Sequence, residues 1–222
     1  MAKVLLIKPR FFSGFWLEGT VTQPMGLMYL GATVQESGHQ PKIHDCVLDY
    51  KELHVLRRTI LDWKPDFIGL SIIITEIEET RRIMELIREI MPDIPVAFGG
   101  PWPTANPEES IQEYGADYVV RGEGERVFPQ LIDAVLNEWP TEKIPGTAFM
   151  ANDALTINPI CFLTQDELNE LPFPARELID HALYANMNAM AGVGYRPYLP
   201  VVTSRGCPYR CSFCTTWRFY RR

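Results

Sequence analysis

The sequence predicts an α/β protein with a doubly wound, five-stranded parallel sheet, followed by a connector and a short terminal segment of different character. Two observations carry this prediction. Over the first 140 residues, short apolar runs alternate with amphipathic segments of helical period, as in a parallel sheet covered by helices on both faces. Three of the five cysteines fall between residues 207 and 214, beyond that pattern.

Each expected strand is a short apolar run, as in strands buried on both faces of a sheet. In chain order the strands are expected at KVLLI (3–7), PKIHDC (41–46), DFIGLSIII (66–74), PVAFGG (95–100) and DYVV (117–120). Right-handed crossovers between them favour the strand order 2-1-3-4-5. Ligands bind beyond the carboxyl ends of such strands, so a site is expected in the loops after residues 8, 70, 98 and 121.

Each expected helix repeats its apolar residues at three or four positions, which places them on one face. In chain order the helices are expected from Pro24 to a stop at Gly38, over 51–63, over 77–91, from Asn106-Pro107 to a stop at Gly115, and over 125–138. Pro107 suits the first helical position, and the acids after it face the positive end of the helix dipole.

The pattern changes after Trp139. Residues 144–158 predict a hairpin that turns at Asn152-Asp153, and the polar, proline-rich stretch after it predicts an extended connector. A new buried strand is expected over 198–204, running directly into the cysteine loop. We therefore expect a sheet domain over 1–140, a connector over 141–196, and the start of a second domain over 197–222.

Composition excludes several classes of protein. A hydrophobic fraction of 46% is typical of a globular protein, and no apolar run approaches the roughly 20 residues of a membrane span. The amino terminus is charged too early for a secretion signal, so we expect a cytoplasmic protein without a membrane partner. The six arginines and no acids of residues 181–222 suit an anionic cofactor. Nucleic acid is disfavoured because the pI is about 5.2.

The segment RGCPYRCSFC places Cys207, Cys211 and Cys214 on one loop. Thiolates are soft ligands that zinc and iron–sulfur centres prefer, but a structural zinc site needs four ligands and no histidine follows His181. Three cysteines suit an iron–sulfur cluster with one open iron. A zinc knuckle, a ferredoxin-like centre and free cysteines are the alternatives. Cys46 and Cys161 are interpreted as small buried hydrophobes.

This loop resembles the signature of radical S-adenosylmethionine enzymes. The resemblance implies that Cys207, Cys211 and Cys214 hold a [4Fe-4S] cluster whose fourth iron chelates S-adenosylmethionine. It also implies that Phe213 lies against the adenine. The cluster is anionic, so the nearby arginines at 205, 210 and 218 are expected to offset its charge.

The strand-end loops are similar to those of the cobalamin (B12)-binding domain, of the flavodoxin-like type, that is fused to many of these enzymes. The matching residues are Ser71, Ile72 and Ile73 after the third strand, Gly99 and Gly100 after the fourth, and Gly122, Glu123 and Gly124 after the fifth. LPFPAREL (171–178) resembles the connector to the radical enzyme's barrel. The first loop has no histidine to coordinate cobalt, so either cobalamin binds without a protein nitrogen or it does not bind.

The resemblance implies a radical enzyme that transfers a methyl group to an unactivated carbon of a small molecule or peptide, with electrons from a flavodoxin or ferredoxin. No residue is assigned a catalytic role. Because 222 residues cannot include a (β/α) barrel of about 200 residues as well, we expect an amino-terminal part of a larger enzyme, either truncated or completed by another polypeptide, and inactive alone. A non-catalytic cobalamin module and an iron–sulfur electron-transfer protein are the alternatives.

Other doubly wound proteins fit less well. A response regulator needs an Asp at the end of the third strand, where Ser71 stands, and a flavodoxin needs a hydroxyl-rich loop where PRFFSGF stands. No G-x-G-x-x-G follows a strand, so a dinucleotide-binding fold is also disfavoured.

Overall fold

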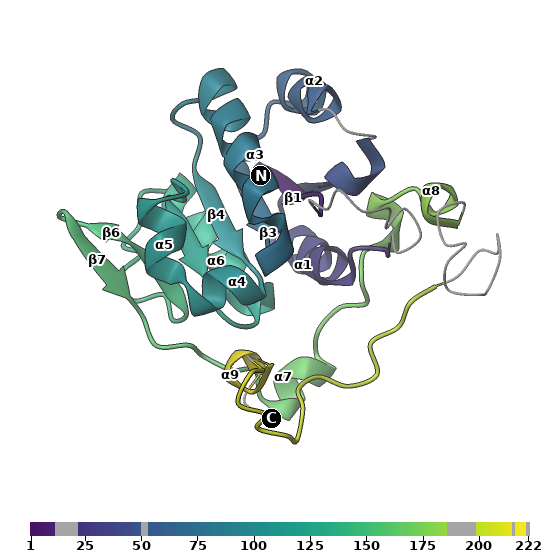
Figure 1. Cartoon of the computed structure of the whole chain (residues 1–222), viewed down its shortest axis with the longest axis vertical. Coiled ribbons are helices and arrows are strands. Elements are labelled where there is room, and N and C mark those ends of the chain that lie inside the picture. The colour runs from purple at the N-terminus through teal and green to yellow at the C-terminus, as the bar shows by residue number, and fades with distance from the viewer. Residues whose placement is uncertain (12–21, 50–52, 186–198, 215, 221–222) are drawn as a thin grey trace.

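The computed structural model describes residues 1–11, 22–49, 53–185, 199–214 and 216–220, with only the backbone of 217 and 218. Most of the predicted loop after the first strand, and the stretch of 186–198, lie outside this set. Figure 1 shows one central sheet with helices on both sides and a terminal segment returning to one end of the sheet. Within the described residues, no helix is long and apolar enough to cross a membrane.

The sheet has seven strands in the order β2-β1-β3-β4-β5-β6-β7. They are β1 (Lys3–Lys8), β2 (Gln40–Asp45), β3 (Phe67–Ser71), β4 (Val96–Gly99), β5 (Tyr118–Val120), β6 (Thr147–Ala151) and β7 (Ala154–Ile157). The first five are parallel, which confirms the predicted 2-1-3-4-5 order, and the last two are antiparallel.

Helices cover both faces of this sheet, and alternate strand residues face opposite layers. On β1, Val4 and Leu6 pack in the core beneath α1 (Met25–Glu36) and α6 (Gly124–Leu136). Leu5 and Ile7 pack in the core on the other face, beneath α2, α3, α4 and α5. These four helices are His54–Trp63, Ile77–Ile90, Pro101–Ala105 and Pro107–Gln112. The four β1 residues are fully buried, as a doubly covered sheet requires.

The remaining elements are short. They are the 3-10 turns η1 (Cys46–Asp49), η2 (Ile74–Glu76) and η3 (Arg176–Leu178), and the helices α7 (Gln165–Asn169), α8 (His181–Ala185) and α9 (Thr216–Tyr220). Helix α4 was not predicted. It begins immediately after the paired glycines and includes two prolines, Pro101 and Pro103, which are tolerated in a first helical turn.

The predicted hairpin turns at Asn152-Asp153, where both residues have positive φ angles of 48° and 62°. This is the left-handed pair that a two-residue hairpin turn requires. The hairpin does not stand apart in the connector, because β6 pairs with β5 and extends the sheet. The edge of β5 would otherwise present unpaired backbone groups.

Two expectations for the later part of the chain are wrong. Residues 199–204 form no strand, since they pair with no other described strand, and Val201 and Val202 are exposed. Cys161 is exposed rather than buried, whereas Cys46 is buried as expected. Cys161 lies in an irregular segment whose side chains alternate between the interior and the solvent: Ile160 and Leu163 face inward, and Cys161 faces outward.

Glu76 is a buried carboxyl at the start of α3. Its side chain accepts a hydrogen bond from the Ile73 N–H at 2.9 Å, and the residue is 3% exposed. Burial raises its pKa from 4.5 to about 7, against the smaller opposing effects of the Ile73 N–H and Lys8. The folded protein therefore holds this proton more tightly than the unfolded chain, and stability is lost as pH rises from about 4.5 through 7.

We expect Glu76→Gln to remove this loss. Between pH 4.5 and pH 8, wild type should lose up to about 3 kcal/mol of its free energy of unfolding that the variant does not lose, since one pKa unit corresponds to about 1.4 kcal/mol. Urea unfolding at a series of pH values measures the effect. Glu78→Gln, on an exposed acid in the first turn of α3, is the control. Equal pH profiles for wild type and Glu76→Gln would contradict the assignment.

Candidate ligand-binding site

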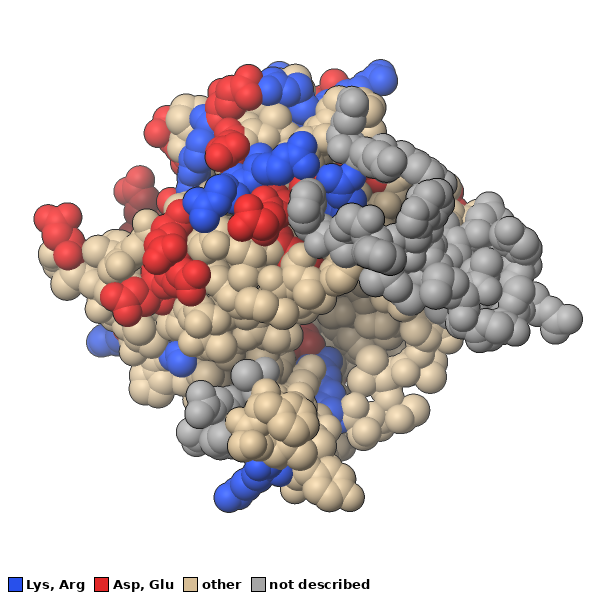
Figure 2. Space-filling model, in the orientation of Figure 1, with Lys and Arg blue, Asp and Glu red and all other residues tan. Residues whose placement is uncertain are grey.

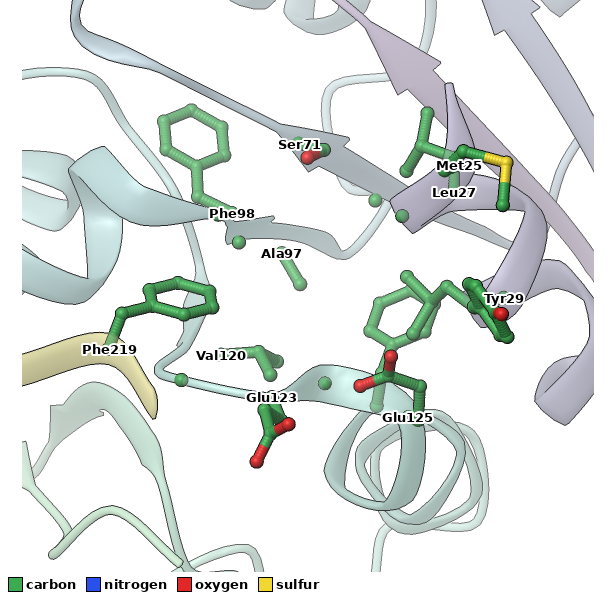
Figure 3. Close-up of a pocket in the computed structure, with 18 of the residues that line it drawn as sticks. Met25, Leu27, Tyr29, Ser71, Ala97, Phe98, Val120, Glu123, Glu125 and Phe219 are labelled. Carbon is green, nitrogen blue, oxygen red and sulfur yellow. The ribbon is translucent and has the colours of Figure 1, made fainter. Parts of the chain in front are cut away.

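A hollow of about 330 Å³ lies at the carboxyl ends of β3, β4 and β5, between α1 and α6. Figure 3 shows its sheet side with Ser71, Ala97 and Val120, and its α1 side with Met25 and Leu27. The hollow occupies the expected position for a doubly wound sheet, beyond the carboxyl ends of the strands.

Small residues create this hollow. Gly69 and Ser71 on β3, and Ala97 and Gly99 on β4, occupy alternate positions that face α1 and α6. A Cβ atom on Gly69 would lie 2.8 Å from the Phe128 ring, so only glycine lets this ring of α6 pack against β3. By contrast, a Cβ on Gly99 would meet nothing closer than 3.7 Å. The space beside Gly99 is therefore open to a ligand.

The paired glycines also fix the turn out of β4. Gly100 has a φ angle of 98°, and a Cβ there would lie 2.8 Å from the Ile72 carbonyl oxygen. Since that neighbour is backbone, it cannot yield to a side chain. The Ile72 carbonyl accepts a bond from the Trp102 N–H at 3.3 Å, so the ends of β3 and β4 are held together where α4 begins.

The loop after β5 forms another side of the hollow through Gly122, Glu123 and Gly124. The Gly122 N–H donates to Thr104 Oγ1 at 3.0 Å, which joins this loop to α4. Glu123 is 3% exposed, and its Oε2 accepts a bond from the Leu163 N–H at 3.2 Å. The connector is thereby held against the sheet domain.

Arg205 joins the cysteine segment to the same loop. Its Nη1 lies 3.3 Å from Glu123 Oε1 and its Nη2 lies 2.6 Å from Glu125 Oε1, while the guanidinium stands 5.2 Å from the Tyr29 ring centroid. Burial alone would lower the pKa of Arg205, but the two carboxylates outweigh it and the pKa rises. Figure 2 shows acidic and basic atoms inside a recess of the surface. We call the cluster of Arg205, Glu123 and Glu125 the arginine bridge.

The cysteine loop lies beside the hollow, because residues on both sides of it line the cavity. Arg205 precedes the loop and Phe219 of α9 follows it. Cys207 and Cys214 are partly buried, and Cys211 is exposed. Hydrogen bonding with the side chain and the backbone of Thr216 lowers the pKa of the Cys214 thiol, whose Sγ lies 3.2 Å from Thr216 Oγ1. In the described structure the three sulfurs are not within 4.8 Å of one another, so they form no site for a single ion.

The structure brings most of the sequence-predicted residues together. Ser71, Gly99, Gly100, Gly122, Glu123 and Gly124 all line the hollow. Ile72 is buried below it, Ile73 is 43% exposed, and Phe213 is 90% exposed. Their side chains do not line the hollow.

Sequence reasoning missed the α1 wall and the pairing of Arg205 with Glu123 and Glu125. The available signal was the acidic GEGE segment of residues 122–125 opposite an arginine-rich terminus. Arg210 is exposed, and the side chain of Arg218 lies outside the described set.

Comparisons with known proteins agree with this geometry. The model of the B12-binding domain family matches residues 19–132. An uncharacterized methyltransferase of Pyrococcus horikoshii is 31% identical over 96% of this chain and 45% of its own length. The anaerobic magnesium-protoporphyrin IX monomethyl ester cyclase of Rubrivivax gelatinosus is 27% identical over 99% of this chain and 39% of its own length.

A solved structure shows the same fold. The cobalamin-dependent S-adenosylmethionine radical enzyme OxsB, with aqua-cobalamin and S-adenosylmethionine bound, superposes with a TM-score of 0.77 at 21% identity. The match covers 96% of this chain and 28% of that one. This chain therefore spans less than half the length of each of these three proteins.

We expect Arg205→Met to destabilise the protein by about 3 kcal/mol, because it leaves two buried carboxylates without their cation. Adding Glu123→Gln and Glu125→Gln should restore much of the loss by removing those charges. Urea unfolding at pH 7 measures both changes. Arg210→Met, on an exposed arginine of the same loop, is the control. If Arg205→Met unfolds like this control, the arginine bridge does not stabilise the fold.

Proposed function

The chain belongs to the B12-binding radical S-adenosylmethionine family, and on that premise we propose that it holds cobalamin over the hollow and a cluster on the adjacent cysteine loop. The observation that supports this most directly is the hollow itself, which small residues keep open at the strand ends. The arginine bridge holds the cysteine segment beside it. The two proposed sites are therefore neighbours.

The hollow fits one part of cobalamin. A cavity of about 330 Å³ is too small for the whole corrin, but it admits the planar base that ends the nucleotide tail. Apolar walls from Leu27, Val120 and Phe128 suit the faces of such a base. The corrin would rest outside, over the rim formed by the strand ends.

The protein's own residues position the group and exclude water. Ser71 places a hydroxyl on the rim that can bond a ring nitrogen, and the Gly99 backbone permits close approach. Arg205 offsets one of the two negative charges of Glu123 and Glu125, which reduces their repulsion of an anionic tail. A bound cobalamin supplies a transferable methyl group, and a reduced cluster with S-adenosylmethionine supplies radical chemistry.

For the longer protein, we propose methyl transfer to an unactivated carbon of a small molecule or peptide. The related protein of P. horikoshii bears a methyltransferase name, whereas that of R. gelatinosus is a cyclase, so the family includes both chemistries. Cys207, Cys211 and Cys214 would hold the cluster, and Phe213 would lie against the adenine. A flavodoxin or ferredoxin would supply electrons.

A second candidate is a cobalamin-binding module without catalysis. Two observations favour it: the expected barrel strand is absent from the described residues 199–204, and Cys211 and Phe213 are exposed. A radical enzyme has to shield its reactive intermediates from water. The described structure provides no such cover over Phe213, which is 90% exposed.

We expect Gly99→Leu to weaken cobalamin binding at least about tenfold, since a side chain there enters the hollow and tenfold corresponds to only about 1.4 kcal/mol. Spectrophotometric titration of the full chain with aqua-cobalamin measures the dissociation constant. Ala154→Leu, which adds a side chain on an exposed strand, is the control, with thermal melting as the test of folding. Equal affinities in folded Gly99→Leu and wild type would contradict the placement of cobalamin.

We expect anaerobic reconstitution with iron and sulfide to give the broad absorption of an iron–sulfur cluster. Cys211→Ala should lose this absorption, while Cys161→Ala, on another exposed cysteine, should keep it. Addition of S-adenosylmethionine and reductant then separates the two candidates. Release of 5'-deoxyadenosine supports the enzyme, and its absence with cobalamin retained supports the module.

A further inference from the structure

A second hollow, of about 580 Å³, lies at the carboxyl end of β2 and shares no lining residue with the first. It is bounded by β2, η1 and the start of α2, and by the connector around η3 and α8. His44 and Asp49 line it, and Cys46 lies between them in the sequence. Neither the cobalamin site nor the cysteine loop uses these three residues.

Local structure brings the three side chains together. His44 is near the end of β2, and the η1 turn over Cys46–Asp49 follows that strand immediately. As a result His44 Nε2 lies 2.7 Å from Asp49 Oδ2. The ligand atoms of His44, Cys46 and Asp49 all lie within 4.8 Å of one another, and in the described structure no other three His, Cys, Asp or Glu residues do so.

The three groups have the chemistry of a zinc site. Zinc takes nitrogen, sulfur and oxygen ligands in a tetrahedron, with bonds of about 2.0 to 2.3 Å. Two such ligands stand about 3.4 Å apart, so the present 2.7 Å contact between Nε2 and Oδ2 would have to widen only slightly. The side chains of His44 and Asp49 are each 9% exposed, and Cys46 is 2% exposed, which shields the set from bulk water.

Neighbouring groups support the same geometry. Thr59 Oγ1 lies 3.4 Å from His44 Nδ1 and can accept a hydrogen bond from the Nδ1–H when Nε2 binds a cation. Asp45 is already engaged, because its Oδ2 accepts from the Tyr184 hydroxyl at 3.0 Å and its Oδ1 from the Val47 N–H at 3.0 Å. It therefore supports the turn rather than supplying a fourth ligand. His44 and Asp49 line the second hollow, so a water molecule in that hollow can reach the fourth position.

We propose that His44 Nε2, Cys46 Sγ and Asp49 Oδ2 bind one zinc ion, with water from the second hollow as the fourth ligand. Binding releases the proton of the Cys46 thiol and moves the ring proton of His44 to Nδ1. Burial raises the pKa of that thiol well above its ordinary value, so the metal has to displace a firmly held proton. The ion would join the end of β2 to the turn that leads into α2.

Cobalt(II) is the probe that tests the site, because a tetrahedral cobalt thiolate has both visible bands and a near-ultraviolet charge-transfer band. The 222-residue chain is used with Cys207→Ser, Cys211→Ser and Cys214→Ser, which removes the competing cysteine loop. We expect one equivalent of cobalt to produce both bands and one equivalent of zinc to abolish them. Absence of the thiolate band in this folded protein overturns the proposal, whatever the behaviour of further variants.

Point variants then assign the ligands. In the same background, Cys46→Ser should lose the thiolate band, and Asp49→Asn should weaken cobalt binding at least about tenfold. Cys161→Ser, which removes an exposed cysteine elsewhere, should change neither. Circular dichroism confirms folding of each variant. A band that persists in Cys46→Ser, or an affinity unchanged in Asp49→Asn, places the metal elsewhere and overturns the proposal.

Discussion

The charge pairing of Arg205 with Glu123 and Glu125 is the interaction on which the arrangement of the two proposed cofactor sites depends. Arg205 is about eighty positions from the two acids in sequence, and its side chain is only 13% exposed. Removal of the cation or of a carboxylate from such a buried group destabilises the fold, because it leaves an unpaired charge in an environment of low polarity. Since Glu123 also accepts from the Leu163 N–H, the sheet domain, the connector and the cysteine segment meet at one carboxylate.

A second constraint on the structure comes from glycines, which have no side chain. Gly69 admits the Phe128 ring, Gly100 admits the Ile72 backbone, and Gly99 leaves open space. Gly69 in β3 thus lets a helix pack, Gly99 at the end of β4 leaves room for a ligand, and Gly100 just after β4 fixes a turn. The same spacing explains why the hollow lies over β3 and β4, where small residues face α1 and α6, and not over β1, where Val4 and Leu6 fill the corresponding layer.

Local patterns were enough to predict the parallel sheet. The apolar run at residues 3–7 and the helical period of residues 77–91 each specify their own element, and the hairpin follows from the left-handed preference of Asn152-Asp153. What local patterns could not specify were contacts that depend on the assembled chain. The partner of Arg205, the pairing of β6 with β5, and the outward orientation of Cys161 are decided by neighbours distant in sequence. The run at 199–204 has strand composition, but a strand needs an adjacent backbone and the described chain offers none.

The hairpin of β6 and β7 also determines where additional residues can be inserted without altering the cofactor-facing end of the sheet. Thr147 pairs with Val120 at the carboxyl end of β5, and β7 returns the chain to that same end. Because two strands are added, the chain moves further along the sheet but leaves it at the same end, the carboxyl end of β5. The turn at Asn152-Asp153 accordingly occupies the opposite pole from both the hollow and the cysteine loop. Extra residues accommodated at this tip would lengthen a remote protrusion and leave the cofactor-facing end of the molecule as it is.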